Sequence, residues 1–212
     1  MLVKQIKWSD NKEAQDMILN KHYAQRKPSI SYLFGLYDED KLLGVCSFGK
    51  PASHSLCIGV CGRENAGRVY ELNRLYVEPT SVKNITSWFV SRCLKQLKKD
   101  KLIIVSYSDT GMNHNGYIYQ ATNFLYTGTT KGRTDKYTEG NTHSRHYTND
   151  NNHLRKVRTP KHRYVYLLDK KDIDNLKYPV LQYPKGNNKN YVIGERMKTK
   201  ILNKKDGTEF YV

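Results

Sequence analysis

The chain contains 212 residues, which is enough for one well-buried domain and short for two. Its 36 Lys and Arg residues against 20 Asp and Glu residues give a formal net charge of +16. No run reaches the roughly 20 apolar residues of a membrane span, and Met1–Trp8 lacks the apolar core and cleavage site of a signal peptide. Secretion and membrane insertion are therefore not expected, and we predict a cytoplasmic protein without a membrane partner.

The first part of the sequence predicts a strand, a helix and a hairpin. Leu2–Trp8 alternates weakly between apolar and polar residues, as a strand does. Ser9 or Asp10 can cap a helix that runs to about residue 20. Ile30–Tyr37 and Lys41–Phe48 are rich in β-forming residues and are joined by a short acidic connection, so they predict a β-hairpin.

The middle of the sequence predicts a long loop, a strand and an amphipathic helix. Gly49–Gly67 contains Gly, Ser, Pro and Asn throughout and predicts a loop with at most a short strand at Leu56–Val60. Tyr70–Val77 predicts a further strand. Between residues 85 and 97 the apolar side chains share one helical face, which predicts the clearest helix of the chain.

The second half predicts three more strands and one more helix. Leu102–Tyr107 is a compact apolar run of the kind found in the interior of a sheet. A helix over Asn113–Asn123 precedes a strand at Phe124–Thr129, and Tyr164–Leu168 is the last predicted strand, followed by a polar tail from Lys185. This order predicts an α/β fold in which a mixed sheet carries helices on both faces.

The cysteines predict neither a disulfide framework nor a metal site. Cys46, Cys57, Cys61 and Cys93 are too few and too irregularly spaced for a disulfide scaffold. His54 precedes Cys57 and Cys61 at a spacing that zinc sites use, but no second ligand pair follows at a fitting distance. We therefore expect ordinary thiols in a reducing compartment and assign no metal ligand, while whether a metal is bound stays open.

The positive charge is densest between Lys131 and Lys170, where tyrosines are interspersed among the cations. Flexible cations beside stacking rings suit a phosphate backbone with exposed bases. The alternative is a solvated basic surface that only aids solubility. We favour double-stranded DNA as the partner of a basic segment at residues 129–163. The cations assigned to DNA binding are Lys131, Arg133, Arg145, Arg155, Lys156 and Arg158.

Three segments resemble the fold of the GNAT acyl-coenzyme A transferases. The strand Tyr70–Val77 leads into a long helix, Leu102–Asp109 forms a second strand, and Tyr117–Gly128 combines a tyrosine-containing helix with an Asn-Phe junction and a glycine. The resemblance implies a GNAT-like mixed, splayed β-sheet with helices on both faces, plus a basic C-terminal extension. It also implies that the cofactor is acetyl-coenzyme A or a related group donor.

The phosphate-binding loop of that fold is altered in this sequence. Val82–Ile85 stands where a Gln/Arg-x-x-Gly-x-Gly/Ala loop is usual, and it contains no glycine. The N-terminus of the following helix, aided by Lys83, can bind a phosphate through free backbone N–H groups and the helix dipole. The residues assigned to binding of the donor are Arg74, Lys83, Asn84 and Ser87.

Arg74 is a cation within an apolar strand, where a buried guanidinium needs a counter-charge. A carboxylate or phosphate of a ligand would supply that charge. The alternative is an internal partner such as Glu71 or Asp109.

Six motifs between residues 22 and 128 together resemble the Mom family, phage proteins of the Mu type. That family converts adenine in DNA to an N6-carbamoylmethyl form and so evades host restriction. The resemblance implies the same activity for this chain. The motifs are His22-Tyr23-x-x-Arg26-x-Pro28, Gly44-Val45-Cys46-Ser47-Phe48-Gly49-x-Pro51, Gly59-Val60-Cys61-Gly62, Glu71-Leu72-Asn73-Arg74-Leu75, Asn84-x-x-Ser87 and Ser106-Tyr107-Ser108-Asp109.

The resemblance places four residues in a catalytic site. His22 can move a proton and Tyr23 can donate to a developing charge, although a histidine at a helix end can also simply interact with the helix dipole. Asp109 ends a strand, where α/β sheets place ligands, and could accept a proton from an exocyclic amine or orient His22. The alternative is a cap for the helix at Asn113 or an Asx turn with Gly111. Tyr119 matches a tyrosine that protonates the leaving thiolate in GNAT enzymes, with Tyr117 and Tyr126 as competing candidates. The alternative for Tyr119 is a core residue.

We therefore expect a GNAT-like catalytic domain over residues 1–170 that includes the basic segment, and a polar extension over residues 171–212. The expected activity is transfer of a carbamoylmethyl group to adenine N6 in double-stranded DNA. One alternative is a conventional coenzyme A-dependent N-acetyltransferase that acts on a protein or a small-molecule amine. The other is a non-catalytic DNA-binding protein that keeps a GNAT-like fold.

Overall fold

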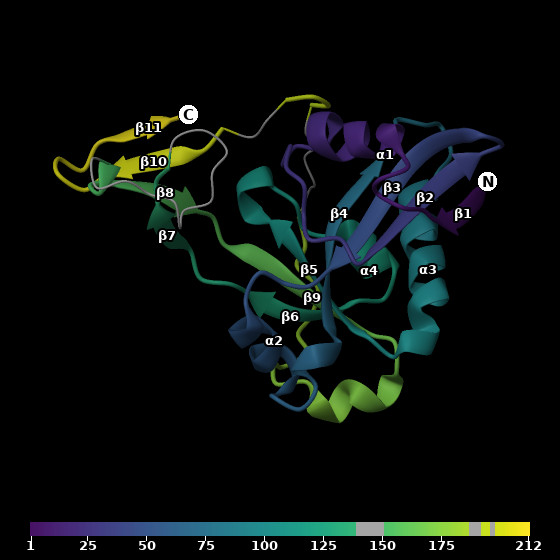
Figure 1. The fold of residues 1–212 in the computed structure, drawn as a ribbon. Helices are drawn as coiled ribbons and strands as arrows, with labels where there is room; N and C mark the ends of the chain where they lie inside the picture. Colours follow the sequence, from purple (N-terminus) through teal and green to yellow (C-terminus); the bar gives the residue numbers. More distant parts are fainter. Residues whose placement is uncertain (139–150, 187–191, 196–197) are drawn as a thin grey trace.

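A computed structural model describes residues 1–138, 151–186, 192–195 and 198–212 (Figure 1). Its main feature is a seven-stranded sheet in the order β1-β2-β3-β4-β5-β9-β6, in which β4 and β5 are parallel and the other neighbours are antiparallel. The strands are β1 (Leu2–Gln5), β2 (Tyr32–Asp38), β3 (Lys41–Gly49), β4 (Val69–Val77), β5 (Ile103–Asp109), β6 (Leu125–Thr129) and β9 (Lys161–Leu167).

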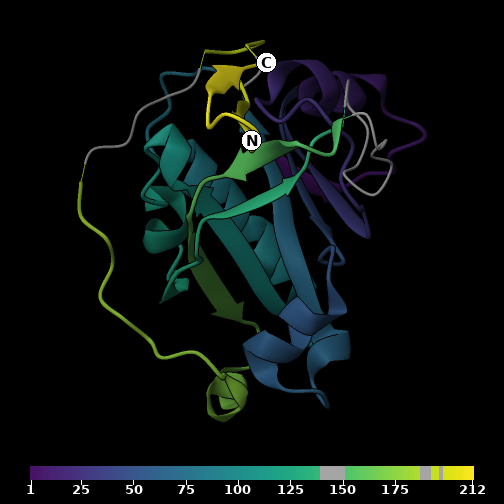
Figure 2. The ribbon, with the colours of Figure 1, turned by 90° about the vertical axis from the view of Figure 1, so that its left-hand side faces the viewer.

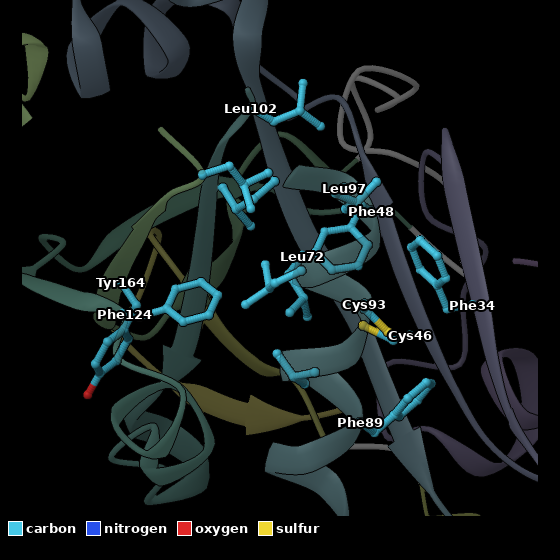
Figure 3. Close-up of a cluster of buried hydrophobic side chains, with 14 of the residues drawn as sticks. Phe34, Cys46, Phe48, Leu72, Phe89, Cys93, Leu97, Leu102, Phe124 and Tyr164 are labelled. Carbon is cyan, nitrogen blue, oxygen red and sulfur yellow. The ribbon is translucent and has the colours of Figure 1, made fainter. Parts of the chain in front are cut away.

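Helices cover both faces of this sheet because alternate strand residues are apolar on each side. On one face, α1 (Lys12–Asp16) with its π-helical continuation Met17–Lys21 packs on β2 and β3, and α2 (His54–Cys61) packs on β4 and β5. On the other face, α3 (Ile85–Leu97) and the short α4 (Tyr117–Ala121) enclose the largest cluster of buried side chains (Figure 3). The predicted α/β fold with helices on both faces is confirmed.

The parallel strands β4 and β5 separate along their length, as the resemblance implied. They pair only from Val69 to Glu71 on β4 and from Ile103 to Val105 on β5. Beyond that point each strand continues, to Val77 and to Asp109, without pairing to the other. The splayed sheet is confirmed, and its opening lies at the carboxyl ends of two adjacent strands, where α/β sheets place ligands.

A bulge beside this opening decides which side chains face it. On β3, Phe48 pairs with Leu72 and Ser47 pairs with Arg74, so Asn73 is the extra residue on β4. An extra residue shifts the alternation of a strand by one position. Glu71 and Arg74 therefore project from the same face, although an unbulged strand would place them on opposite faces.

A second, four-stranded antiparallel sheet in the order β11-β10-β8-β7 projects from the body (Figures 1 and 2). We call it the arm. The sequence predicted none of its strands, and it wrongly made the strand near Tyr164 the last one. The strands of the arm are β7 (Arg133–Lys136), β8 (Leu154–Arg158), β10 (Lys200–Asn203) and β11 (Glu209–Tyr211).

After β9, residues 168–186 run along the outside of the body (Figure 2). A 3-10 helix at Lys170–Asn175 is held by the ion pair between Arg68 and Asp172. Farther on, Leu181 forms a bridge with Tyr126, and Gly194 accepts a 2.8 Å hydrogen bond from the side chain of Gln25. The C-terminal extension therefore returns to the loop that follows α1.

Two predicted elements are corrected. The loop prediction for residues 49–67 is wrong at α2, because Ser53 accepts a hydrogen bond from the Leu56 N–H and the buried side chains of α2 follow a helical spacing. The first helix is capped by Asn11, whose side chain accepts from Ala14 at 2.8 Å, and not by Ser9 or Asp10. No helix within the described residues is long and apolar enough to cross a membrane.

Candidate active site and basic arm

His22 ends the π-helical turn and is buried, with 5% of its surface exposed. The Ala24 N–H donates to its Nδ1 at 3.1 Å, so Nδ1 is an acceptor and the ring proton is assigned to Nε2. Burial, followed by the positive charge of Arg74 and the nearby His114, lowers the pKa of His22 to about 3. His22 is therefore a neutral N–H donor near neutral pH and a weak base. Of its predicted roles, donating a hydrogen bond fits this state better than taking up a proton.

Tyr23 stacks on His22 at a centroid distance of 4.4 Å and meets His114 edge-on at 6.2 Å. Burial raises the pKa of Tyr23, and the negative charge of Asp109 raises it further, while Arg74 acts in the opposite direction. The phenol therefore stays protonated and can donate a hydrogen bond to a developing negative charge. These interactions also show that positions 22, 23, 74 and 109 converge on one place.

Arg74 is held by backbone carbonyls. Its guanidinium donates to the Arg26 carbonyl at 3.1 and 3.3 Å and to the Asn73 carbonyl at 2.6 Å. Within the described part of the chain, no carboxylate lies within ion-pair distance of it, so Glu71 and Asp109 are not its salt-bridge partners. A largely buried cation that is held but not neutralised is suited to an anionic ligand.

Asp109 ends β5, and its carboxylate is already engaged. It accepts the Gly111 N–H at 2.9 Å and the Thr159 hydroxyl at 2.5 Å, and it lies 3.0 Å from the Lys161 ammonium. The predicted alternative of an Asx turn with Gly111 is thus present together with the strand-end position. Because three groups already contact its carboxylate, Asp109 is well placed to orient neighbouring groups.

Glu71 is the residue that the sequence reasoning missed. It is mostly buried beside Arg74 and Lys161, and burial raises its pKa although both cations oppose the rise. Its side chain makes no hydrogen bond to any described residue, and no fully buried polar atom among these residues lacks a partner. The Glu71 carboxylate must therefore reach the open surface of the site. The signal was a carboxylate three residues before Arg74 in the same strand, which we interpreted only as a counter-charge for Arg74.

Tyr119 reaches the opening from the other face of the sheet. Its ring packs between Phe124 at 5.3 Å and Tyr164 at 5.2 Å. Burial raises its pKa well above the usual value, a hydrogen bond with Ser106 partly offsets the rise, and Tyr23 contributes electrostatically. Ser106 lies on β5 just beyond the last residue paired with β4, and its hydroxyl donates to the Leu72 carbonyl on β4. The hydrogen bond with Ser106 therefore places the Tyr119 hydroxyl where β4 and β5 separate.

The other two tyrosines of this segment lie elsewhere. Tyr117 is 41% exposed at the start of α4. The Tyr126 hydroxyl shares hydrogen bonds with Thr129 and with His162 at 2.9 and 3.0 Å. Tyr119 is therefore the best placed of the three candidates.

The residues predicted to bind the donor do not all gather with Arg74. Lys83, Asn84 and Ser87 lie at the N-terminus of α3, and no hydrogen bond or ion pair between described residues joins them to the cluster around Arg74. Asn84 adopts a left-handed conformation with φ of 60° and makes no capping hydrogen bond. The first N–H groups of α3 therefore have no side-chain acceptor from this cap and can receive an anion.

The basic segment forms much of the arm and joins the site at its base. Thr159, in the connection between β8 and β9, and Lys161, the first residue of β9, both contact Asp109. Arg145 lies outside the described residues. Among residues that are described, no group of three or more His, Cys, Asp or Glu side chains is arranged to hold a metal ion. The predicted cations that lie on the arm or just before it are Lys131, Arg133, Arg155, Lys156 and Arg158.

The splayed sheet and its covering helices define a GNAT acetyltransferase-like fold. A Salmonella typhimurium protein described as an acetyltransferase, solved with acetyl-CoA, is 12% identical with a TM-score of 0.50, over 80% of this chain and 95% of its own. The ribosomal-protein-S18-alanine N-acetyltransferase of Escherichia coli is 10% identical with a TM-score of 0.50, over 79% of this chain and 94% of its own.

A ribosomal-protein-alanine N-acetyltransferase of Brucella melitensis is likewise 10% identical with a TM-score of 0.50, over 79% of this chain and 99% of its own. These likenesses show the fold. No curated protein sequence matches the chain. The model of the Mom protein family matches residues 3–185, and the chain belongs to this family.

Proposed function

We propose that this protein is a transferase that adds a carbamoylmethyl group to the N6 atom of adenine in double-stranded DNA, and that it thereby protects phage DNA from host restriction. Membership of the Mom family and the acetyltransferase-like fold support a group-transfer reaction. The observation that carries the proposal is the convergence of Tyr23, Glu71, Arg74 and Asp109 at the opening of the sheet, directly beside a basic arm.

The target adenine must leave the base stack to reach this opening. Its N6 amine is conjugated to the ring and is a poor nucleophile, so a proton acceptor has to help. Glu71 supplies that acceptor, because its carboxylate is unengaged and burial raises its pKa. The bond from N6 would form to the methylene carbon of the donor while the bond from that carbon to the leaving group breaks. The N6 proton would pass to Glu71, and the leaving group would take a proton from Tyr119.

The donor is expected to be related to acetyl-coenzyme A. Acetyl-coenzyme A itself would give an N6-acetyl group through its thioester carbonyl, so a carbamoylmethyl product requires a related donor that presents a methylene carbon and carries the amide nitrogen. The uncapped N-terminus of α3 and the exposed Lys83 fit the phosphates of such a donor, although glycines are lacking there. Arg74 fits an anionic group of the adenine nucleotide or of the donor, because its charge has no carboxylate partner among the residues that the structure covers. His22 and Tyr23 orient the reacting groups as hydrogen-bond donors.

The test is nucleoside mass spectrometry of DNA from bacteria that express the protein. We expect a deoxyadenosine that carries the mass of one carbamoylmethyl group. Glu71→Gln keeps the shape of the side chain but removes the proton acceptor, so it should lower the modified fraction by about 100-fold or more. Duplex affinity of this variant should be unchanged.

Asp109→Asn is the matched comparison, because it alters a carboxylate that is already hydrogen-bonded. A larger loss of modification in Asp109→Asn than in Glu71→Gln would assign the proton acceptor to Asp109. Acetyl transfer to peptides or polyamines without any change in DNA would instead establish a conventional N-acetyltransferase. Salt-dependent DNA binding with unmodified bases would establish a non-catalytic DNA-binding protein.

A further inference from the structure

The arm is built from two parts of the sequence that lie far apart. The basic segment contributes β7 and β8, and the C-terminal extension contributes β10 and β11. Ile201 pairs with Lys156 and Leu202 pairs with Arg155, and the Lys204 N–H donates to the His153 carbonyl at 2.8 Å. The end of the chain is therefore a structural half of the same sheet that carries the predicted DNA-binding cations.

The C-terminal half of the arm also adds positive charge. Among its described residues, Lys200 pairs with Glu209, and Asp206 accepts hydrogen bonds from Thr208. Lys204 and Lys205, in the turn between β10 and β11, are exposed and have no acidic partner in the described part of the chain. Two ammonium groups at an exposed turn are thus available to an anionic partner.

The pairing of β7 with β8 places like charges directly opposite each other. Arg133 lies opposite Arg158, and Lys136 lies opposite Arg155. Like charges at such positions repel and destabilise a sheet. Asp135 relieves the first pair by ion pairs of 3.4 Å to Arg133 and 2.8 Å to Arg158. A sheet that holds so many cations together favours a polyanion as its partner.

We infer that the C-terminal strands β10 and β11 form part of the DNA-binding surface, with Lys204 and Lys205 contacting phosphates of the duplex next to those bound by β7 and β8. The inference rests on the proposed function for the identity of the polyanion. It assigns the extension a role in holding the substrate. Because Thr159 follows β8 directly and its hydroxyl donates to Asp109, a duplex on the arm lies beside the site.

The experiment measures binding of a short fluorescein-labelled DNA duplex by anisotropy, using the full chain at several salt concentrations. The variant Lys204→Glu/Lys205→Glu should weaken binding by about tenfold or more and lower the salt slope by about two, since each lost phosphate contact removes about 0.9 from it. The control is Lys98→Glu/Lys99→Glu, which changes the same charge at the exposed end of α3, away from the arm (Figure 1). It should leave the slope unchanged.

Equal losses in the two double variants would overturn the inference, because they would show an effect of net charge alone. Tighter binding of single-stranded RNA than of the duplex would also overturn it. The milder Lys204→Gln/Lys205→Gln, with a thermal melt matching the parent protein, covers the case in which charge reversal disrupts the turn. Mass spectrometry of the parent protein separates the two proposals: unmodified DNA contradicts the proposed function, whereas modified DNA with normal binding by the variant contradicts only this inference.

Discussion

The opening of the main sheet and the arm use the same kinds of side chain in opposite environments. At the opening, Arg74 and Glu71 are mostly buried. Burial lowers the pKa of Arg74 and raises the pKa of Glu71, because it disfavours the charged form of each. On the arm, Arg133 pairs with Asp135 while 74% of the arginine side chain stays exposed to water. The opening of the sheet holds a few charges that are mostly buried, and the arm holds many charges that are exposed to water.

This difference separates chemistry from affinity. Buried charges interact strongly with one another and are little screened by salt, so they can tune proton transfer. Exposed ion pairs contribute little to stability and are screened within about 8 Å at physiological ionic strength. We therefore expect substitutions at the opening to change the turnover rate and its pH dependence. Substitutions on the arm should change DNA affinity and its salt dependence.

The largest expected effect concerns His22, which is buried beside the opening of the main sheet. Because the pKa of His22 is lowered from 6.5 to about 3, the unfolded chain takes up a proton there before the folded protein does. The free energy of unfolding should therefore fall as the pH drops from about 6.5 toward 3. The contribution of His22 to this fall is on the order of 4 kcal/mol. His22→Gln lacks the titrating ring and should remove this part of the acid sensitivity.

Urea denaturation of both proteins at pH 7 and at pH 4 measures this effect. The control is His54→Gln, which replaces an exposed histidine at the start of α2 and should leave the pH dependence unchanged. If His22→Gln and the parent protein lose the same stability on acidification, the low pKa of His22 is contradicted. His22 would then take up a proton in the folded protein as readily as in the unfolded chain.

Much of the main sheet was predictable because its signals are local. The strands β2 to β5 and the helix α3 show the apolar periodicity of their final structure, and a short connection joins β2 to β3. The prediction that His22, Tyr23 and Asp109 share one site came from the resemblance, since no local pattern places residues so far apart in the sequence side by side. The fold then explains it by the separation of β4 from β5.

The missed features depend on pairing between distant segments. Glu71 faces the opening together with Arg74 because of one extra residue opposite β3, a shift of register that the alternation in β4 does not reveal. The arm strands are rich in charged residues and have no apolar face of their own. Leu154–Arg158 becomes a strand because β7 and β10 pair with it from either side, and its partner Ile201 is fully buried.

A smaller effect on the free energy of unfolding is expected for the ion pair between Asp172 and Arg68. Asp172 is buried and pairs with Arg68, whose side chain is 35% exposed, and this pair fastens the C-terminal extension to the body. Asp172→Asn should lower the free energy of unfolding by about 2 kcal/mol, less than for a fully buried pair because water can reach Arg68.

Urea denaturation at low and at high salt measures this loss. The exposed Asp174, two residues away, provides the control as Asp174→Asn and should change stability by less than about 0.5 kcal/mol. A loss for Asp172→Asn that disappears at high salt would place this pair with the exposed charges of the arm.

The smallest expected effect on stability concerns Asp135 on the arm. Its substitution should lower stability slightly but raise DNA affinity. Asp135→Asn removes the ion pairs to Arg133 and Arg158, which together should contribute less than about 1 kcal/mol because both arginines reach water. Hydrogen exchange of β7 and β8 would report this local loss. The same substitution frees two guanidinium groups for phosphates, so duplex affinity should rise a few-fold at low salt and the gain should shrink as salt is added.

Glu64→Gln, an exposed carboxylate on the body, is the matched control for the change in net charge. If the two variants gain affinity equally, the gain reflects long-range attraction and the arginines of the arm do not contact phosphates. If Asp135→Asn instead weakens binding, the ion pairs hold β7 and β8 in the shape that the duplex requires. In that case the arm is a preorganised surface, and the contrast with the opening of the main sheet is smaller than its exposed charges suggest.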